Sequence, residues 1–522
     1  MKQRAASEIA ILRRIQPLLL ATAMVAVVLP LLVVTLPPLH DYPFHLARAD
    51  AIAALMGQVA HATPYLQGSF ALPNVAMDVV MLGLTALLPP PVSGRVFLAL
   101  LLLLTLGGVA ALHRVLHGRV SPWPLLAGFF LYNSIFLFGF TNYLFGVAIM
   151  LWSVAAWLAL ARAGWLWRLA AGSVLAVMLL FCHLMAFGLF AVVLGGLALH
   201  EALAAWHRSP REALARLLLP AVPVAAALAL FVALSPTAGE AGQPIAYHGW
   251  IGWKPLMAYR TLLGANPWLD AVTLVPVVLL VAGLALARRL GVAAAMVLPL
   301  ALLGATFLVM PHALFGALYA DARLPVAVML VAIAALDVRR LPPRAVALGG
   351  AALVALLAGR SVGVARDWQS FAPVHARHEA AFALLPPGAV LWAATAAPYP
   401  SLAYRSPAEL ALWHPPLKHV ASLASVGRDV FVPSTWADPF KQPIAVPPRY
   451  QAAKALQGDN PFQTPGAAAL DSVVAAIRGL RAPGEAAHDF LLLSHPAALQ
   501  GTPSPGLAAI AQGPTFTLFR ID

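Results

Sequence analysis

The sequence has few charged side chains and almost no cysteine. Only 10% of its 522 residues are charged, whereas a typical soluble domain has about 25%. Hydrophobic residues make up 61% of the chain, more than a globular core can hide. These fractions exclude a soluble protein. The single cysteine, Cys182, excludes a disulfide framework and a cysteine-based metal site. The sequence also lacks a nucleotide-binding glycine loop, an HExxH metal motif and a nucleophile elbow.

In place of charge, the sequence has a succession of apolar runs long enough for membrane helices of about 20 residues. The net charge of +13 comes from short basic clusters between these runs. Such clusters are typical of cytoplasmic loops, so nucleic acid is excluded as a partner. We expect an α-helical multi-pass protein of a bacterial inner membrane, with about 12 or 13 transmembrane helices.

The first apolar run, residues 17–36, follows the basic residues Lys2, Arg4, Arg13 and Arg14. It is too long for the apolar region of a signal peptide, and a small-residue cleavage site does not follow it. We therefore expect an uncleaved first helix with its N-terminus in the cytoplasm.

One region does not fit a topology in which successive loops alternate between the two sides of the membrane. Residues 76–113 look like two helices broken at prolines 89–91, which places Arg114 and Arg119 outside. Later basic clusters, by contrast, mark the cytoplasmic side. Either this loop breaks the charge rule, or one of the two helices is short or re-entrant.

The composition changes near Val364. We expect a membrane domain over residues 1–364, whose first periplasmic loop covers about 38–75. Residues 365–522 predict a periplasmic α/β domain, and its expected elements are strands at 390–394, 490–494 and 516–521 and a helix at 471–480. The sequence shows no internal repeat, which disfavours a transporter built from inverted halves.

The first loop carries the most informative polar residues. Helical periodicity begins after Pro43 and predicts a helix at the membrane surface. Asp41, His45 and Arg48 are spaced so that they share one helix face. A carboxylate, an imidazole and a guanidinium at the level of the lipid headgroups could bind a phosphate or activate a hydroxyl group. Two simpler roles are a helix N-cap for Asp41 and a lipid contact for Arg48.

Other polar residues lie where the outer ends of helices are expected. Asp78 falls near the outer end of the second helix, where it is either functional or solvated at the interface. His183 falls at an outer hairpin tip, where a structural role is the alternative. His312, Tyr319 and Arg323 belong to the last outer loop. All five are candidates for substrate binding, and a surface pair with Asp321 is the alternative for Arg323.

Three segments together resemble the GT-C superfamily of polyprenyl-phosphate-sugar glycosyltransferases. The first helix is followed by an outer loop that opens with an acidic residue. The string LYADARLPVAVMLVAIAAL, residues 318–336, looks like the helix start after a late outer loop in that family. The C-terminal residues 489–522 look like the closing strands of its periplasmic domain. The chain is thus similar to protein mannosyltransferases and aminoarabinose transferases, as a divergent member.

The resemblance implies a function and a site. A sugar would pass from a polyprenyl-phosphate donor to an envelope lipid, glycan or protein on the periplasmic face, in contact with membrane lipids. Asp41 would be the catalytic residue, and Arg323 matches the position expected to contact the lipid phosphate. Family members often carry paired acids in the first loop, whereas here Asp41 has His40 and His45 beside it. Asp41 could therefore act as a metal-independent general base, or bind a divalent cation such as Mg²⁺ or Mn²⁺ with help from His45.

Two other functions remain open. The first is a transporter or flippase for a lipid-linked substrate, which predicts polar residues along a path through the helices. The second is a non-catalytic GT-C-like protein of envelope assembly, because Asp41 lacks a paired acid. The candidate residues gather at the outer ends of the helices, which favours an enzyme that works on one face.

Overall fold

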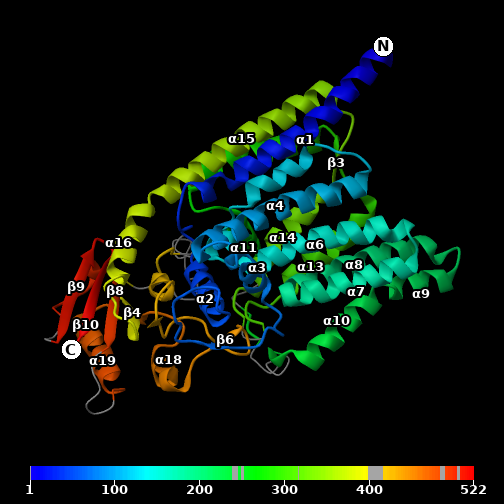
Figure 1. Cartoon of the computed structure of the whole chain (residues 1–522). Helices are drawn as coiled ribbons and strands as arrows, with labels where there is room; N and C mark the ends of the chain where they lie inside the picture. The colour runs from blue at the N-terminus through cyan, green and yellow to red at the C-terminus, as the bar shows by residue number, and fades with distance from the viewer. Residues whose placement is uncertain are drawn as a thin grey trace. The chain divides into compact units, whose positions relative to one another are not determined.

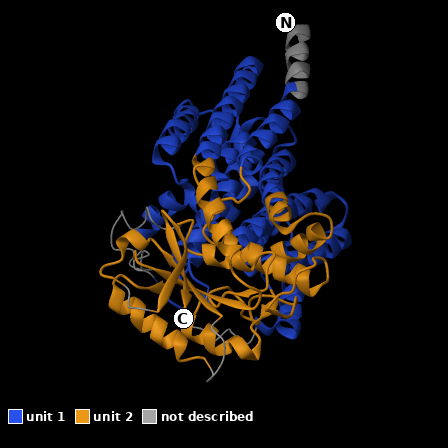
Figure 2. Ribbon diagram, turned by 60° about the vertical axis from the view of Figure 1, so that its left-hand side comes forward, with its two compact units in different colours: residues 1–33, 73–76, 98–366 blue, residues 34–72, 77–97, 367–522 orange. Residues whose placement is uncertain are grey.

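The computed structural model describes residues 2–237, 245–247, 252–314, 317–397, 415–481, 488–502 and 506–522, with side chains from residue 15 onward. The chain divides into two compact units (Figure 2). Unit 1 comprises residues 1–33, 73–76 and 98–366, and unit 2 comprises residues 34–72, 77–97 and 367–522. The first outer loop therefore groups with the C-terminal residues and not with the apolar helices.

The first two thirds of the chain are mostly helical, and many of the helices are long (Figure 1). Their bounds are α1 Lys2–Leu32, α3 Ala76–Thr85, α4 Pro90–His117, α5 Ser134–Phe138, α6 Thr141–Ala159, α7 Trp165–Cys182, α8 Leu184–Trp206, α9 Pro210–Leu218, α10 Ala221–Leu234, α11 Trp253–Leu262, α12 Pro267–Leu286, α13 Val297–Val309, α14 Ala320–Ala335 and α15 Pro343–Gln369. Short 3-10 helices lie at η1 Trp123–Phe130, η2 Leu160–Arg162 and η4 Ala294–Met296.

Within unit 1, α6, α7, α8 and α13 pack side by side (Figure 1). Gly196 of α8 faces the backbone of Pro299 in α13, and a Cβ at Gly196 would lie 2.6 Å from the Pro299 Cα. Such contacts use small residues to bring helices together, as is usual in membranes.

Eight helices in the described part of the chain are long and apolar enough to cross a membrane. They are Ile15–Leu32, Pro90–His117, Thr141–Arg162, Trp165–Cys182, Leu184–Trp206, Pro210–Leu234, Pro267–Leu286 and Pro343–Phe382. The predicted polytopic helical class is confirmed, but the expected count of about 12 or 13 is higher than the eight found among these residues. Three further apolar stretches, 76–85, 123–138 and 294–309, form helices too short to qualify.

The region that did not fit the charge rule is explained within this arrangement. Helix α3 has 10 residues, too few to cross a hydrocarbon core of about 30 Å. Strand β2 (Leu290–Val292) pairs antiparallel with β3 (Leu336–Val338). The Arg119 Nη2 donates to Asp337 Oδ1 of β3 at 2.7 Å, and the Arg339 backbone N–H donates to the Arg289 carbonyl at 2.8 Å. Arg119 therefore lies at the same end of unit 1 as the later basic residues Arg289 and Arg339. This is the expected arrangement if α3, the helix before α4, is too short to cross the membrane.

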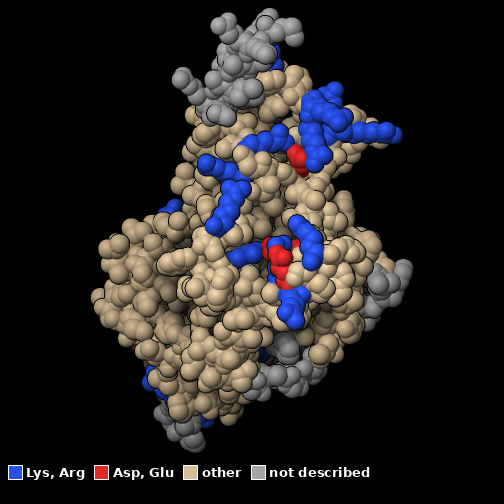
Figure 3. All heavy atoms as spheres, turned by 90° about the vertical axis from the view of Figure 1, so that its right-hand side faces the viewer, with Lys and Arg blue, Asp and Glu red and all other residues tan. Residues whose placement is uncertain are grey.

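The surface agrees with a membrane protein. Figure 3 shows one face on which Lys and Arg side chains form a few groups and most of the area carries no charge.

Unit 2 contains a mixed sheet with the order β5-β4-β8-β10-β9, and β7 also pairs with β4. Its strands are β4 Ala389–Thr395, β5 Val430–Phe431, β7 Phe462–Gln463, β8 Asp489–Ser494, β9 Leu507–Gly513 and β10 Phe516–Ile521. Strand β4 is parallel to β5, β7 and β8, and β10 is antiparallel to β8 and β9. The helices of this part are α16 Ala372–Phe382, α18 Gln451–Gln457 and α19 Ala467–Arg478, with 3-10 helices η5 Val420–Ser425, η6 Pro448–Tyr450 and η7 Pro496–Ala498. The three predicted strands and the predicted helix of the α/β domain are confirmed.

The first loop is part of the same unit. Helix α2 (Tyr42–Leu55) begins where the sequence predicted and packs against η5. Strand β1 (Leu66–Gln67) pairs antiparallel with β6 (Ile444–Ala445). Twelve of the 14 residues of α2 are buried, so α2 is enclosed by protein and does not present one face to lipid as expected. The reason is its composition, because a helix that is apolar on most sides is stable only when it is buried.

Candidate active site in the first loop

Asp41 lies at the N-terminus of α2. Its backbone carbonyl accepts hydrogen bonds from the N–H groups of Phe44 and His45 at 3.1 and 3.3 Å. Among the described residues, its side chain makes no hydrogen bond that caps the helix. The N-cap alternative therefore does not account for the carboxylate, which is nonetheless only 1% exposed.

Two imidazoles face the same oxygen of this carboxylate. The Nε2 atoms of His40 and His419 lie 3.5 and 3.6 Å from Asp41 Oδ1. The other ring nitrogen of His40, Nδ1, lies 3.0 Å from the carbonyl oxygen of Pro415. A carbonyl can only accept, so this Nδ1 carries the proton and the Nε2 of a neutral His40 presents a lone pair to Asp41.

His419 comes from the segment just before η5 and was not predicted as a site residue. Burial lowers the pKa of its imidazole well below the ordinary value, and the neighbouring His40 and Lys418 lower it further. His419 is therefore neutral. Apart from the presence of several histidines in residues 365–522, no pattern in the sequence indicates this contact.

Arg48 is held by Asp78 of α3. Its Nε and Nη2 donate to the two carboxylate oxygens of Asp78 at 2.6 and 3.1 Å, a bidentate pair in which both side chains are 1% exposed. Nη2 also lies 3.1 Å from Nδ1 of His45. Because a guanidinium can only donate, His45 accepts at Nδ1 and carries its own proton on Nε2. The Arg48–Asp78 ion pair therefore determines that His45 donates its hydrogen bond from Nε2.

Aromatic rings pack around His45 and His419. The Phe44 ring contacts those of His419 and Trp436, at centroid distances of 4.1 and 4.5 Å, and the latter two rings are 6.2 Å apart. The His45 ring meets Trp436 edge-on at 6.4 Å. Sequence reasoning missed Trp436, which lies in a loop far along the chain.

The remaining predicted residues gather in a second cluster, inside unit 1. The Arg323 guanidinium lies over the Phe140 ring at 4.2 Å. Its Nη2 donates to the Leu318 carbonyl at 2.9 Å, and its Nη1 lies 3.4 Å from Nε2 of His183. The Nδ1 of His183 in turn accepts from the Met185 backbone N–H at the start of α8.

His312 and Tyr319 belong to the same cluster. Nδ1 of His312 lies 3.1 Å from Asp321 Oδ1, and Lys254 Nζ lies 2.7 Å from Asp321 Oδ2. The Tyr319 and His312 rings meet edge-on at 5.0 Å. Asp321 is therefore engaged by Lys254 and His312, and a surface pair with Arg323 is not the arrangement found in the described part of the chain.

The structure thus brings the candidates together in two sets. The Asp41 cluster, in unit 2, comprises His40, Asp41, His45, Arg48, Asp78 and His419. The Arg323 cluster, in unit 1, comprises His183, Lys254, His312, Tyr319, Asp321 and Arg323. The roles of these residues towards a substrate stay predictions.

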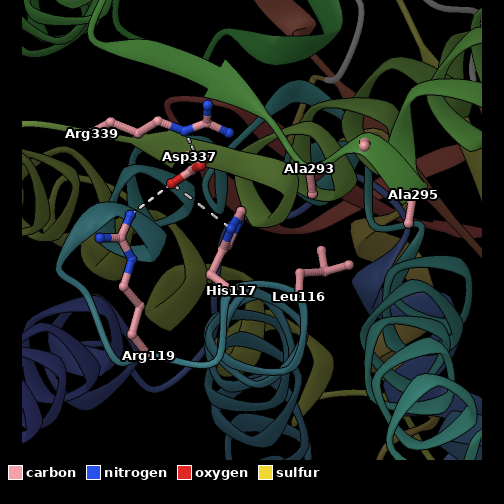
Figure 4. A pocket seen from close by; sticks show the side chains of 8 residues that line it. Leu116, His117, Arg119, Ala293, Ala295, Asp337 and Arg339 are labelled. Carbon is pink, nitrogen blue, oxygen red and sulfur yellow. Dashed lines mark hydrogen bonds and ion pairs between the residues drawn. The ribbon is translucent and has the colours of Figure 1, made fainter.

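A cavity of about 560 Å³ lies elsewhere in unit 1, next to β2 and β3 (Figure 4). Asp337 stands at its wall, paired with Arg119 at 2.7 Å and also with Arg339. His117 is 4.0 Å away from the same carboxylate. The described lining of this cavity contains none of the predicted site residues, and its charges serve to join the β2–β3 ladder to the end of α4.

Comparison with known proteins identifies the fold. No family model matches the sequence, and no curated protein matches it either. Two crystal structures of ArnT from Cupriavidus metallidurans do match, one bound to undecaprenyl phosphate and one in the apo state, with TM-scores of 0.52 and 0.51. Each comparison covers 96% of this chain and 97% of that chain at 14% sequence identity. Over nearly its whole length, this chain therefore has the fold of ArnT.

Proposed function

We propose that the chain is a membrane glycosyltransferase that transfers a sugar from a polyprenyl phosphate to an envelope lipid, glycan or protein. The fold it shares with ArnT, crystallised with undecaprenyl phosphate, supports this donor class. The observation that carries the proposal is the Asp41 carboxylate, which is buried at the start of α2 and has the Nε2 atoms of His40 and His419 at 3.5 and 3.6 Å from its Oδ1.

Asp41 acts as the general base. As the acceptor hydroxyl attacks the anomeric carbon, its proton moves to the carboxylate. The new bond joins the acceptor oxygen to that carbon, and the bond from the carbon to the phosphate oxygen breaks. The electron pair of that bond leaves with the polyprenyl phosphate. Attack from the side opposite the leaving group inverts the anomeric configuration. A positioned base of this kind contributes roughly 10²–10⁴-fold to the rate.

The leaving phosphate needs positive groups, and we assign this role to Arg323. A guanidinium binds phosphate through paired N–H donors, and the ring of Phe140 holds this one in place. His183, His312 and Tyr319 surround it and are assigned to substrate binding. Arg48 is engaged by Asp78, so its contribution is to present the Nε2–H of His45 to the donor.

We also propose an orientation in the bacterial inner membrane. Arg119, Arg289 and Arg339 lie at the same end of unit 1. The positive-inside rule assigns that end, and with it the N-terminus, to the cytoplasm. Helix α15 begins just after Arg339 and is long enough to cross the bilayer, so we assign the C-terminal α/β domain that follows it to the periplasm.

The test is donor consumption. The purified chain in lipid nanodiscs is given a panel of polyprenyl-phosphate sugars together with an extract of bacterial envelope lipids, glycans and proteins as acceptors, with and without Mg²⁺ or Mn²⁺, beside Asp41→Asn. We expect release of polyprenyl phosphate from one donor, lowered roughly 10²–10⁴-fold in the variant. If the folded protein releases none from any donor, the transferase is contradicted. Movement of the intact donor across the bilayer would then identify a flippase, and its absence an assembly protein.

A further inference from the structure

His40, Asp41 and His419 form a compact set of metal-ligating side chains. They are 3%, 1% and 4% exposed, and one ligand atom from each lies within 4.8 Å of the others. Two of the three come from the first loop and the third from the segment before η5. We propose that these three residues bind a divalent transition-metal ion of the Zn²⁺ class.

The distances agree with a shared ion. Bonds of about 2.0–2.1 Å to a tetrahedral Zn²⁺ place neighbouring ligand atoms roughly 3.3 Å apart. Asp41 Oδ1 lies 3.5 and 3.6 Å from the two Nε2 atoms. Both imidazoles approach the same carboxylate oxygen, and the three ligand atoms lie within 4.8 Å of one another. The two imidazoles need to close on each other by at most about 1.5 Å for one tetrahedral ion to bind all three.

The donor set selects the metal. Mg²⁺ prefers six oxygen ligands and rarely binds imidazole, whereas two imidazole nitrogens and one carboxylate oxygen suit Zn²⁺, Co²⁺ or Fe²⁺. Nδ1 of His40 donates to the Pro415 carbonyl, which is the outer hydrogen bond that metal-binding histidines usually make. This set therefore favours a transition metal over the Mg²⁺ considered from the sequence.

The surrounding charges set the strength of binding. Lys418, next to His419, is attracted to Asp41 and so competes with a cation for this carboxylate. Asp78, the other carboxylate of the Asp41 cluster, is neutralised by Arg48. Removing the Lys418 charge should therefore tighten metal binding.

Three protein ligands leave a fourth position on the ion, as in catalytic zinc sites. An acceptor hydroxyl that bound there would lose its proton more easily, and the Asp41 carboxylate would take that proton. This catalytic role rests on the proposed transferase function, whereas the binding of the metal does not.

Metal binding is measured on the full-length chain in nanodiscs. The protein is stripped with a chelator and titrated with Zn²⁺, and with Co²⁺ while the visible absorption is recorded. We expect stoichiometric binding and the intense visible bands of four-coordinate Co²⁺. His419→Ala should weaken Zn²⁺ binding on the order of a hundredfold or more, and Lys418→Met should strengthen it.

Two further variants separate ligand loss from misfolding. His61→Ala is the matched control, because His61 pairs with Asp50 in the same loop and lies outside the ligand set. It should bind Zn²⁺ like the wild type. His419→Cys replaces the imidazole by a thiolate, so it should retain Zn²⁺ and add sulfur-to-Co²⁺ absorption bands.

The outcomes for the metal and for the transferase are distinguishable. Failure of the stripped, folded chain to bind Zn²⁺ or Co²⁺, or wild-type binding by His419→Ala, overturns the metal site. Binding lost in His419→Ala and kept in His61→Ala supports it, whether or not sugar transfer is detected. Sugar transfer by a chain that binds no metal overturns the metal site and leaves the transferase standing.

Discussion

The Asp41 cluster and the Arg323 cluster differ in the kind of group that each gathers. In the first, one carboxylate oxygen faces two imidazole nitrogens. In the second, a guanidinium lies among an aromatic ring, an imidazole and a backbone carbonyl. The first collects acceptors and is suited to take a proton or hold a cation, whereas the second presents donors and is suited to hold an anion. Base chemistry and phosphate binding are thus assigned to different side chains.

The two clusters share a supporting device. In each, a buried ion pair fixes a histidine: Arg48–Asp78 orients His45, and Lys254–Asp321 is joined to His312. Burying charges is costly, and a pair repays that cost only when its geometry is good. The comparison therefore makes three predictions about substitutions. Replacing Asp41 should greatly slow the reaction, breaking a buried ion pair should lower stability, and replacing Arg323 should weaken donor binding.

The largest effect is expected at Asp41. Asp41→Asn keeps the size of the side chain and removes the base, so kcat should fall roughly 10²–10⁴-fold while KM for the donor changes little. Stopped assays of polyprenyl phosphate release measure both constants. A wild-type kcat in Asp41→Asn would contradict the proposal that the Asp41 cluster supplies the base and the Arg323 cluster binds the phosphate.

The second effect concerns stability. Arg48→Met leaves Asp78 buried without its partner and should lower the free energy of unfolding by about 3–5 kcal/mol. Adding Asp78→Asn should recover part of this loss. Thermal melting in nanodiscs measures the change, and Arg520→Met is the control because its pair with Asp522 is half exposed and worth under about 1 kcal/mol. Equal melting temperatures for Arg48→Met and the wild type would contradict a supporting role for the pair.

The third effect is expected in donor binding. Arg323→Lys keeps the charge but removes the paired donors. Loss of one hydrogen bond to a charged group costs about 1.5–3 kcal/mol, so KM for the donor should rise roughly tenfold to a hundredfold, with a smaller change in kcat. If kcat falls while KM stays constant, Arg323 acts on the reaction and not on donor binding.

The smallest effect is a pH dependence at Asp50. Burial raises the pKa of this carboxyl above its ordinary value of 3.8, although the Gly427 N–H and His61 act to lower it. A folded-state pKa above the unfolded one means that the carboxyl stabilises the fold fully below about pH 4, and that this contribution is lost as pH rises through the folded pKa. Asp50→Asn should remove this part of the decline in melting temperature. A steeper decline in the variant would show that the sign is wrong.

The sequence by itself determined the features that depend on local pattern. Apolar runs and basic clusters specified a polytopic membrane protein because a bilayer admits little else. Pro43 and the periodicity after it located the start of α2, and alternating runs located β4, β8 and β10. Asp41, His45 and Arg48 were placed on one helix by spacing alone.

Only the tertiary structure decided which distant residues complete these patterns. His419 and Trp436 reach the first loop because residues 34–72 and 367–522 form one compact unit. The assignment of Asp78 to Arg48, of Lys254 to Asp321 and of Arg119 to the later basic clusters likewise required the fold. The physical reason is that periodicity and capping act over a few residues, whereas the partner of a buried charge or imidazole is chosen by the packing of the whole chain.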